Sequence, residues 1–375
     1  MHITSDKKTG TLSFVDKRYV FSITFNRTIR LPEDGNTHSL PPSLGVLPIH
    51  LVDDFSDKVP SDWVEHGGVF LPLHQREALW LGFSGSVSAV KVAAGKINAV
   101  SGQPWNPRLA PGNDQNQDYL VAPKPQPWLD GFNSGNGVIK QFVGMALGQG
   151  YTVEAQVTGE ETFGGIQLLV VPPKKPLYSS ILRTAGISGQ SCNGGPSGQS
   201  VSSAYFSSSA DSSFELSSCV LSERSVDGPM QPRARLTSDS GTAKSLKSAQ
   251  IGMAAGGSMR QKIYPDPHGI DTWNQDSATR VFVHIINAEM YREITGEYPP
   301  KMPVSAQQYK GYYFDLNDNQ MGDLDAPDSL KTVKTVSEMD AKHGFEGQQD
   351  DSPTTEEKVI TYQHDGQVPV RNGKW

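Results

Sequence analysis

The sequence is poor in charged residues, in cysteine and in long apolar runs. Charged residues make up 19% and apolar residues 36% of the 375 residues, and both shares are below those of an average soluble domain. No apolar run approaches the length of about 18 residues that a membrane-spanning helix needs, so we expect no membrane span. The first residues, MHITSDKKTGTLSF, contain no apolar stretch typical of a signal peptide. We therefore expect a cytoplasmic protein, although export without a leader would leave the same pattern.

Positive charge is also scarce. The chain has 33 Lys and Arg against 40 Asp and Glu, a formal net charge of −7, and no basic stripe. Proteins that bind nucleic acid draw much of their affinity from Lys and Arg that neutralise phosphates. Anionic membrane surfaces attract basic segments in the same way. The sequence therefore predicts neither a nucleic-acid partner nor a membrane-surface partner.

The motifs of the common catalytic and cofactor sites are missing. Cys192 and Cys219 lie in a Ser/Gly-rich stretch, and we interpret them as free thiols, a disulfide being the alternative in an oxidising compartment. Neither C-x-x-C nor closely spaced histidines occur, so no zinc site is predicted. Ser84 lies in GFSGS, which lacks the last glycine of a G-x-S-x-G elbow. Phosphate-loop and dinucleotide fingerprints are absent as well. We expect no cofactor, and we favour a protein without enzyme activity.

What the chain has instead is many turns and short alternating segments. It contains 37 Gly and 26 Pro, and its β-branched and aromatic residues recur with period two, as in Phe21, Ile23 and Phe25. This predicts a mostly β protein of two packed β domains, barrel- or sandwich-like, with one or two short helices. The expected domains are 1–110 and 111–343, with a flexible Ser/Gly-rich insertion at 176–248 and an extended polar tail at 344–375.

Individual segments carry more specific predictions. Residues 88–102 predict a hairpin that turns at Gly95, and Asn287 and Gly296 predict the start and end of one helix. A second helix is predicted within 328–340. The remaining predicted strands are 63–73 paired with 78–83, then 138–145, 151–157, 166–171 and 280–286.

The densest group of chemically active side chains is Asp266, His268, Asp271 and Asp276 beside Trp273. Two carboxyl groups about 5–9 Å apart would suit glycoside hydrolysis. Asp130 is a further candidate acid, because it lies beside Trp128 in PWLDGF. The alternative is that these aspartates cap turns of a rigid proline-containing loop, and we favour this alternative.

Three tryptophans are candidates for ligand binding, namely Trp105, Trp128 and Trp273. Exposed indoles stack on sugar rings, whereas buried ones fill the core of a β protein, and the second role is the more frequent. His284 lies within a predicted strand on the same face as Phe282, and we interpret it as a hydrogen-bonded structural histidine rather than a catalytic base.

One segment resembles a calcium-binding loop in part. Asp315, Asn317, Asn319 and Asp323 occupy positions 1, 3, 5 and 9 of the pattern. The pattern then fails, because Gln320 replaces the required glycine and Ala326 replaces the bidentate glutamate. We therefore predict no metal site, with these four residues as the weak candidate.

Three blocks of sequence, PWLDGF at 127–132, YTVEAQVTGEE at 151–161 and MYREITGE at 290–297, resemble a family of uncharacterised microbial proteins. The resemblance covers most of the chain outside the Ser/Gly-rich part. That family has no known activity or site, so the resemblance implies no role for any residue.

The leading hypothesis is a non-enzymatic structural or binding protein. Its β-rich surfaces and proline-rich arms would associate with a second copy or contact a protein or glycan partner. The alternatives are a glycan-directed hydrolase that uses acids drawn from Asp130, Asp266 and Asp271, and a calcium-assisted lectin.

Overall fold

The computed structural model describes residues 1–16, 19–110, 117–174, 250–306, 308–317, 322–345 and 358–363. The predicted insertion at 176–248 lies outside these residues, together with both cysteines. Most of the predicted tail at 344–375 lies outside them too.

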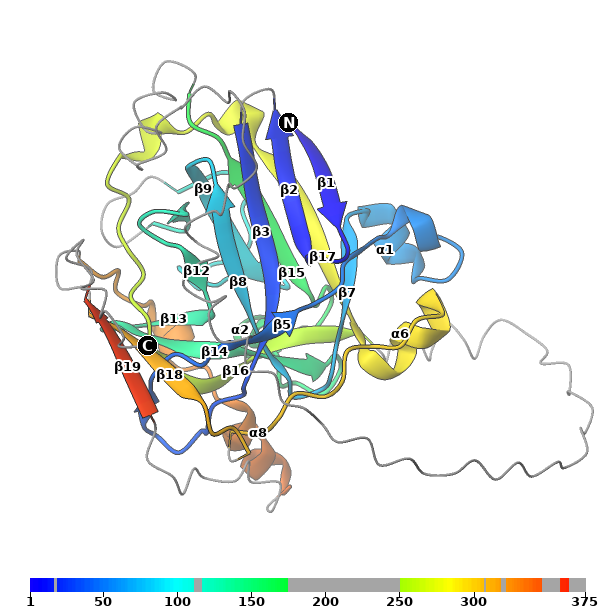
Figure 1. Ribbon diagram of the computed structural model, residues 1–375, viewed down its shortest axis with the longest axis vertical. Coiled ribbons are helices and arrows are strands. Elements are labelled where there is room, and N and C mark those ends of the chain that lie inside the picture. The colour runs from blue at the N-terminus through cyan, green and yellow to red at the C-terminus, as the bar shows by residue number, and fades with distance from the viewer. Residues whose placement is uncertain are drawn as a thin grey trace, which may run out of the picture.

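The N-terminal strands form one edge of the larger of two main sheets (Figure 1). Along β3 the side chains of Phe21, Ile23 and Phe25 are fully buried on one face, as their alternation predicted. The sheet order is β1 (His2–Asp6), β2 (Thr11–Asp16), β3 (Tyr19–Thr28), β8 (Ala78–Gly85), β14 (Val138–Ala146), β16 (Ile251–Arg260) and β4 (Thr37–His38). Three short strands attach to this path, namely β5 (Ser43–Val46), β12 (Trp128–Leu129) and β13 (Gly131–Gly135).

The smaller sheet contains the predicted hairpin and the predicted strand at 166–171. Its order is β10 (Ile97–Asn98), β9 (Ser88–Ala94), β15 (Ile166–Val171), β17 (Thr279–Asn287), β7 (Val69–Leu73) and β6 (His50–Leu51), with β11 (Leu120–Ala122) on β9. Gly95 turns the hairpin between β9 and β10 with φ 54°, a conformation that glycine adopts without strain. A separate pair of parallel strands is formed by β18 (Tyr312–Asn317) and β19 (Lys358–Gln363).

The two sheets pack on each other across one hydrophobic core. Buried side chains such as Phe25 and Phe142 from the larger sheet join Val92, Leu168 and Val283 from the smaller sheet in a single cluster. The prediction of a mostly β, sandwich-like protein is therefore confirmed. Strands from before and after the predicted domain boundary at residues 110–111 pair with each other in both sheets. In the larger sheet β8 pairs with β14, and in the smaller sheet β9 pairs with β15. None of the described helices is long and apolar enough to cross a membrane.

The prediction of a strand at 151–157 is wrong, because this segment contains helix α2 (Val153–Thr158). Thr152 begins the helix, and its hydroxyl oxygen accepts a hydrogen bond from the backbone N–H of Ala155 at 3.1 Å. Gly159 ends it in the left-handed conformation with φ 78°. These two capping residues decide the local structure, and an alternation of only seven residues was too short to distinguish helix from strand.

The predicted pairing of 63–73 with 78–83 is also wrong. The first residues form helix α1 (Ser61–His66), and β7 and β8 belong to different sheets. The short link between β7 and β8 therefore connects the two sheets instead of turning a hairpin. Both strands are buried on both faces over most of their length, and such continuous apolar runs contain no information about which strand is the partner.

The predicted helix after Asn287 is confirmed as α6 (Ala288–Thr295). The side chain of Asn287 accepts from the backbone N–H of Glu289, and Gly296 ends the helix. The helix predicted within 328–340 is divided into α7 (Asp328–Lys331) and α8 (Val336–His343), because Thr335 and Glu338 form a capping box that starts a new helix. Three single turns of 3₁₀ helix complete the elements, namely η1 (Asp53–Phe55), η2 (Ile270–Thr272) and η3 (Gln275–Ser277).

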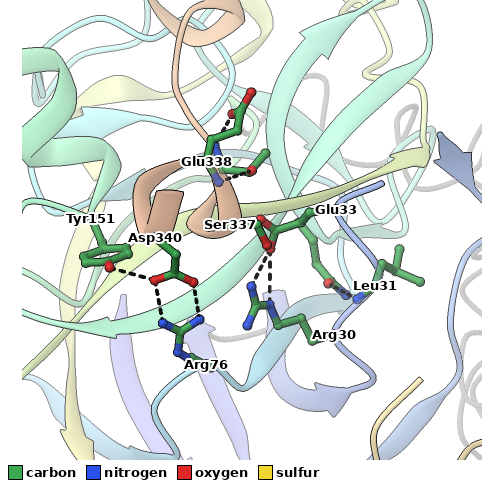
Figure 2. A network of polar contacts seen from close by, with 10 residues as sticks. Arg30, Leu31, Glu33, Arg76, Tyr151, Ser337, Glu338 and Asp340 are labelled. Carbon is green, nitrogen blue, oxygen red and sulfur yellow. Dashed lines mark hydrogen bonds and ion pairs between the residues drawn. The ribbon is translucent and has the colours of Figure 1, made fainter. Parts of the chain in front are cut away.

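Helix α8 is attached to the larger sheet by a network of polar contacts (Figure 2). Arg76 donates two hydrogen bonds to the carboxylate of Asp340, at 2.7 and 2.8 Å, and Tyr151 donates a third at 2.7 Å. Glu33 accepts from the backbone N–H of Ser337. Burial alone would raise the pKa of Asp340, but the hydrogen bonds and the charge of Arg76 outweigh it, so this pKa is lowered.

We expect Asp340→Asn to reduce the free energy of unfolding at pH 7 by about 3 kcal/mol, because Arg76 would lose its charged partner. The lowered pKa means that Asp340 stabilises the fold above its unfolded-state pKa near 3.9, and that this stabilisation is lost as the pH falls through the folded-state value. Urea unfolding of wild type and variant at pH 7 and in acid measures both effects.

The difference between the two proteins should shrink in acid. The same substitution at the exposed Asp57 serves as the control and should change stability by less than about 0.5 kcal/mol. A difference for Asp340→Asn that is equally large at both pH values would contradict the role of the ion pair.

Candidate functional site

Asp266 lies at the centre of a hydrogen-bonded loop. Its carboxylate accepts from the hydroxyl of Tyr119 at 2.7 Å, from the indole N–H of Trp273 at 2.8 Å and from the backbone N–H of His268 at 2.7 Å. Burial and the neighbouring Asp266 raise the pKa of Tyr119. Trp273 is 1% exposed and packs in a core cluster. The contacts of Asp266 therefore fasten the loop, as a turn-capping aspartate does.

Asp130 is a buried carboxyl group and has its own partners. It is 3% exposed, and one of its oxygens accepts from the side-chain amide of Gln261 at 2.9 Å. The side chain of the half-buried Trp128 also hydrogen-bonds to it. Burial raises the pKa of Asp130 to about 7, and the hydrogen bonds from Gln261 and Trp128 oppose this rise.

The structure does not join these two carboxyl groups in one site. Asp130 hydrogen-bonds with Gln261 and Trp128. The partners of Asp266 are Tyr119, Trp273 and His268, so the two carboxyl groups have no hydrogen-bond partner in common among these contacts. Asp271 and Asp276 are exposed, beside a shallow hollow of about 250 Å³ that Arg108 also lines.

Two of the four candidate calcium ligands, Asp315 and Asp323, contact other groups of the protein. Asp323 accepts hydrogen bonds from the backbone N–H groups of Ile263 and Gly137, and Asp315 lies 3.3 Å from the guanidinium of Arg260. Asn319 and the side chain of Asn317 lie outside the described residues. Over the described part of the chain, no three His, Cys, Asp or Glu side chains are grouped as a metal would require.

A row of rings and cations lies on the outer face of the smaller sheet. Along β17 the side chains of Val281, Val283 and Ile285 enter the core between the sheets. The residues that alternate with them, such as Arg280 and Phe282, therefore project from the opposite face. The guanidinium carbon of Arg280 lies 4.3 Å from the ring centre of Phe282.

The row continues in both directions from these two residues. Arg280 also lies 5.3 Å from the ring centre of Trp105. On the other side, the rings of His66 and Phe282 are 4.7 Å apart, the rings of His66 and Phe163 are 5.6 Å apart, and the ammonium of Lys96 lies 4.4 Å from the ring centre of Phe163. We call Trp105, Arg280, Phe282, His66, Phe163 and Lys96 the aromatic–cation row.

Both ends of the same sheet face are covered, and the row occupies the part between them. At one end Leu109, Tyr119 and Trp273 pack on outward-facing residues of β9 and β15. At the other end helices α1 and α6 pack on the sheet through Trp63 and Tyr291. Arg280 is exposed and the other members of the row are half-buried. The row is thus an accessible part of this face.

The neighbouring His284 is a structural residue, as its place in the strand predicted. It is 6% exposed, its ring nitrogen lies 3.0 Å from the backbone oxygen of Gly67, and its ring stacks on Trp63 at 4.6 Å. Burial lowers the pKa of His284 to about 4, so the ring is neutral at pH 7.

Contacts beneath the row hold its members in place. Arg280 donates to the side-chain oxygen of Gln167 at 2.6 Å, and Gln167 donates to the backbone oxygen of Gly95 at 2.7 Å. Lys91 is 1% exposed and pairs with Asp118 at 2.6 Å, and its ammonium lies 5.8 Å from the ring centre of Trp105. Burial lowers the pKa of Lys91. The loop that contains Trp105 is therefore anchored on a buried ion pair.

Of the three tryptophans predicted to bind a ligand, Trp105 lies in the row. Trp128 hydrogen-bonds to the buried Asp130, and Trp273 to the half-buried Asp266. The other five members of the row were missed by the sequence reasoning. The available signal was the alternation of Arg280, Phe282 and His284 with the apolar residues Val281, Val283 and Ile285 along one strand.

Comparison of the chain with protein-family models, with curated proteins and with solved structures found no match. The fold and the row together define a sandwich-like β protein with an accessible ring-and-cation surface on one sheet.

Asp130→Asn should remove a pH dependence of stability. Because the pKa of Asp130 is raised to about 7 in the folded protein, its contribution is fully present below the unfolded-state pKa near 3.9. It is lost as the pH rises through about 7. We expect the wild type to lose stability relative to the variant between pH 4.5 and pH 8, by an amount of the order of 2–4 kcal/mol.

Urea unfolding of both proteins at pH 4.5, 6 and 8 measures this change, and Asp276→Asn, at an exposed position, is the matched control. A difference between wild type and Asp130→Asn that is the same at all three pH values would show that Asp130 is not titrating in this range.

Proposed function

We propose that this protein is a non-enzymatic binding protein that contacts a glycan through the aromatic–cation row. The observation that carries the proposal is the continuous contact of Trp105, Arg280, Phe282, His66, Phe163 and Lys96 across an accessible sheet face.

The chemistry of the row suits a sugar. Aromatic rings such as those of Trp105 and Phe282 bury apolar area against the C–H face of a pyranose ring, and they do so with little loss of side-chain freedom. The N–H groups of Arg280 and Lys96 can donate to sugar oxygens next to the rings. The six residues follow one another across the surface, which fits an elongated ligand such as an oligosaccharide.

The contacts of the candidate acids support a binding role over hydrolysis. Asp266 accepts three hydrogen bonds that fasten its loop, and Asp130 is buried beside Gln261 and Trp128. Neither arrangement pairs two carboxyl groups across a substrate cleft. The calcium-assisted lectin draws no support from Asp315 and Asp323, whose described contacts are with the protein itself.

The test is a glycan array followed by titration calorimetry on any glycan that binds. We expect Trp105→Ala and Arg280→Gln each to weaken binding at least tenfold, because each removes a contact at the accessible surface. Arg292→Gln is the matched control, because Arg292 also lies over an aromatic ring, at 4.2 Å from that of Tyr298, but belongs to helix α6 outside the row.

Thermal melting and circular dichroism establish that the variants fold like the wild type. Light scattering across a dilution series, with 40.7 kDa as the mass of one chain, tests whether a second copy is the partner instead. An assembly that Trp105→Ala and Arg280→Gln disrupt, with no glycan bound, would overturn the proposal in favour of self-association. Equal binding by all variants would show that the row is not the contact surface.

A further inference from the structure

We infer that the glycan bound by the aromatic–cation row carries carboxylate groups, as in an oligosaccharide of uronic acids. This inference rests on the proposed function and adds the chemical class of the ligand. It follows from the two cations of the row, from their surroundings and from the rings between them.

Arg280 is the first cation. It is exposed, and within the described residues its one hydrogen bond is donated to Gln167, with no carboxylate as an ion-pair partner. Gln167 is 2% exposed and is itself fixed by the backbone oxygen of Gly95. The guanidinium is thus held over Phe282 with further N–H donors available, and a guanidinium fork matches the two oxygens of a carboxylate.

Lys96 is the second cation, and it lies at the opposite end of the row over Phe163. It too forms no ion pair within the described residues. Glu154, which is 2% exposed, interacts with it electrostatically. Burial raises the pKa of Glu154, and its carboxylate is directed to the backbone N–H of Gly164 at 3.1 Å. The charge of Lys96 therefore remains available at the surface.

The two cations differ from several others in the same protein. Arg27, Arg76 and Lys91 each lie within 2.8 Å of a carboxylate oxygen of the chain itself. In a chain with a net charge of −7, two cations without such a partner on one face create a local surface that favours an anion.

The rings between the two cations indicate that the anionic group belongs to a sugar unit. Phe282, His66 and Phe163 lie between Arg280 and Lys96 in the order of contacts. A uronic acid unit has a pyranose face that can pack on a ring and a carboxylate attached to the same unit. One oligosaccharide can therefore supply the apolar contacts and both ionic contacts at once.

The experiment is titration calorimetry of the full chain with an oligogalacturonate and with the same oligosaccharide after its carboxyl groups have been reduced to alcohols. We expect the oligogalacturonate to bind at least tenfold more tightly than its reduced form, and the difference to shrink as salt is added. Arg280→Gln and Lys96→Gln should each weaken binding of the oligogalacturonate at least fivefold and leave binding of the reduced form nearly unchanged. Arg292→Gln should change neither.

The outcomes separate this inference from the proposed function. Equal binding of the oligogalacturonate and its reduced form would overturn the inference and leave the glycan-binding function in place. Tight binding of a sulfated dextran without binding of the oligogalacturonate would also overturn it, because the anionic group would then be a sulfate. If neither these oligosaccharides nor any glycan of the array binds the wild type, the proposed function fails as well.

Discussion

The packing of two sheets across a single hydrophobic core is the interaction on which the rest of the structure depends. It buries side chains from strands of both sheets, such as Phe25 in the larger sheet and Val283 in the smaller one. Because side chains alternate along a strand, fixing Val281 and Val283 in the core also fixes Arg280 and Phe282 on the opposite face. The row exists because the core determines which residues of β17 face outwards.

The outer faces of the sheets are then covered by different means. Helix α8 is held on the larger sheet by the ion pair of Arg76 and Asp340, together with Tyr151 (Figure 2). The smaller sheet is covered at its ends by apolar side chains around Trp273 and Trp63. These covers leave part of one face accessible, where Arg280 and Lys96 form no ion pair among the described residues.

The row is held in shape before any ligand binds. Gln167 fixes Arg280, and the buried pair of Lys91 and Asp118 fixes the loop that contains Trp105. A surface whose side chains are already ordered loses less conformational entropy on binding than a flexible one. The glycan binding that we propose would therefore use a surface whose guanidinium is already oriented.

Local sequence determined much of this protein. Alternation identified the buried face of Phe21 to Phe25, Gly95 identified a turn, and Asn287 and Gly296 identified the ends of a helix, because each of these depends on residues close in the chain. The helix after Thr152 also has local signals, namely the capping residues Thr152 and Gly159, but the short alternation at 151–157 was interpreted as a strand. The tertiary structure alone decided that β7 and β8 lie in different sheets and that His66, Lys96, Trp105, Phe163 and Arg280 meet in one row. These outcomes depend on strand pairing between distant segments, and neither periodicity nor capping contains information about the partner.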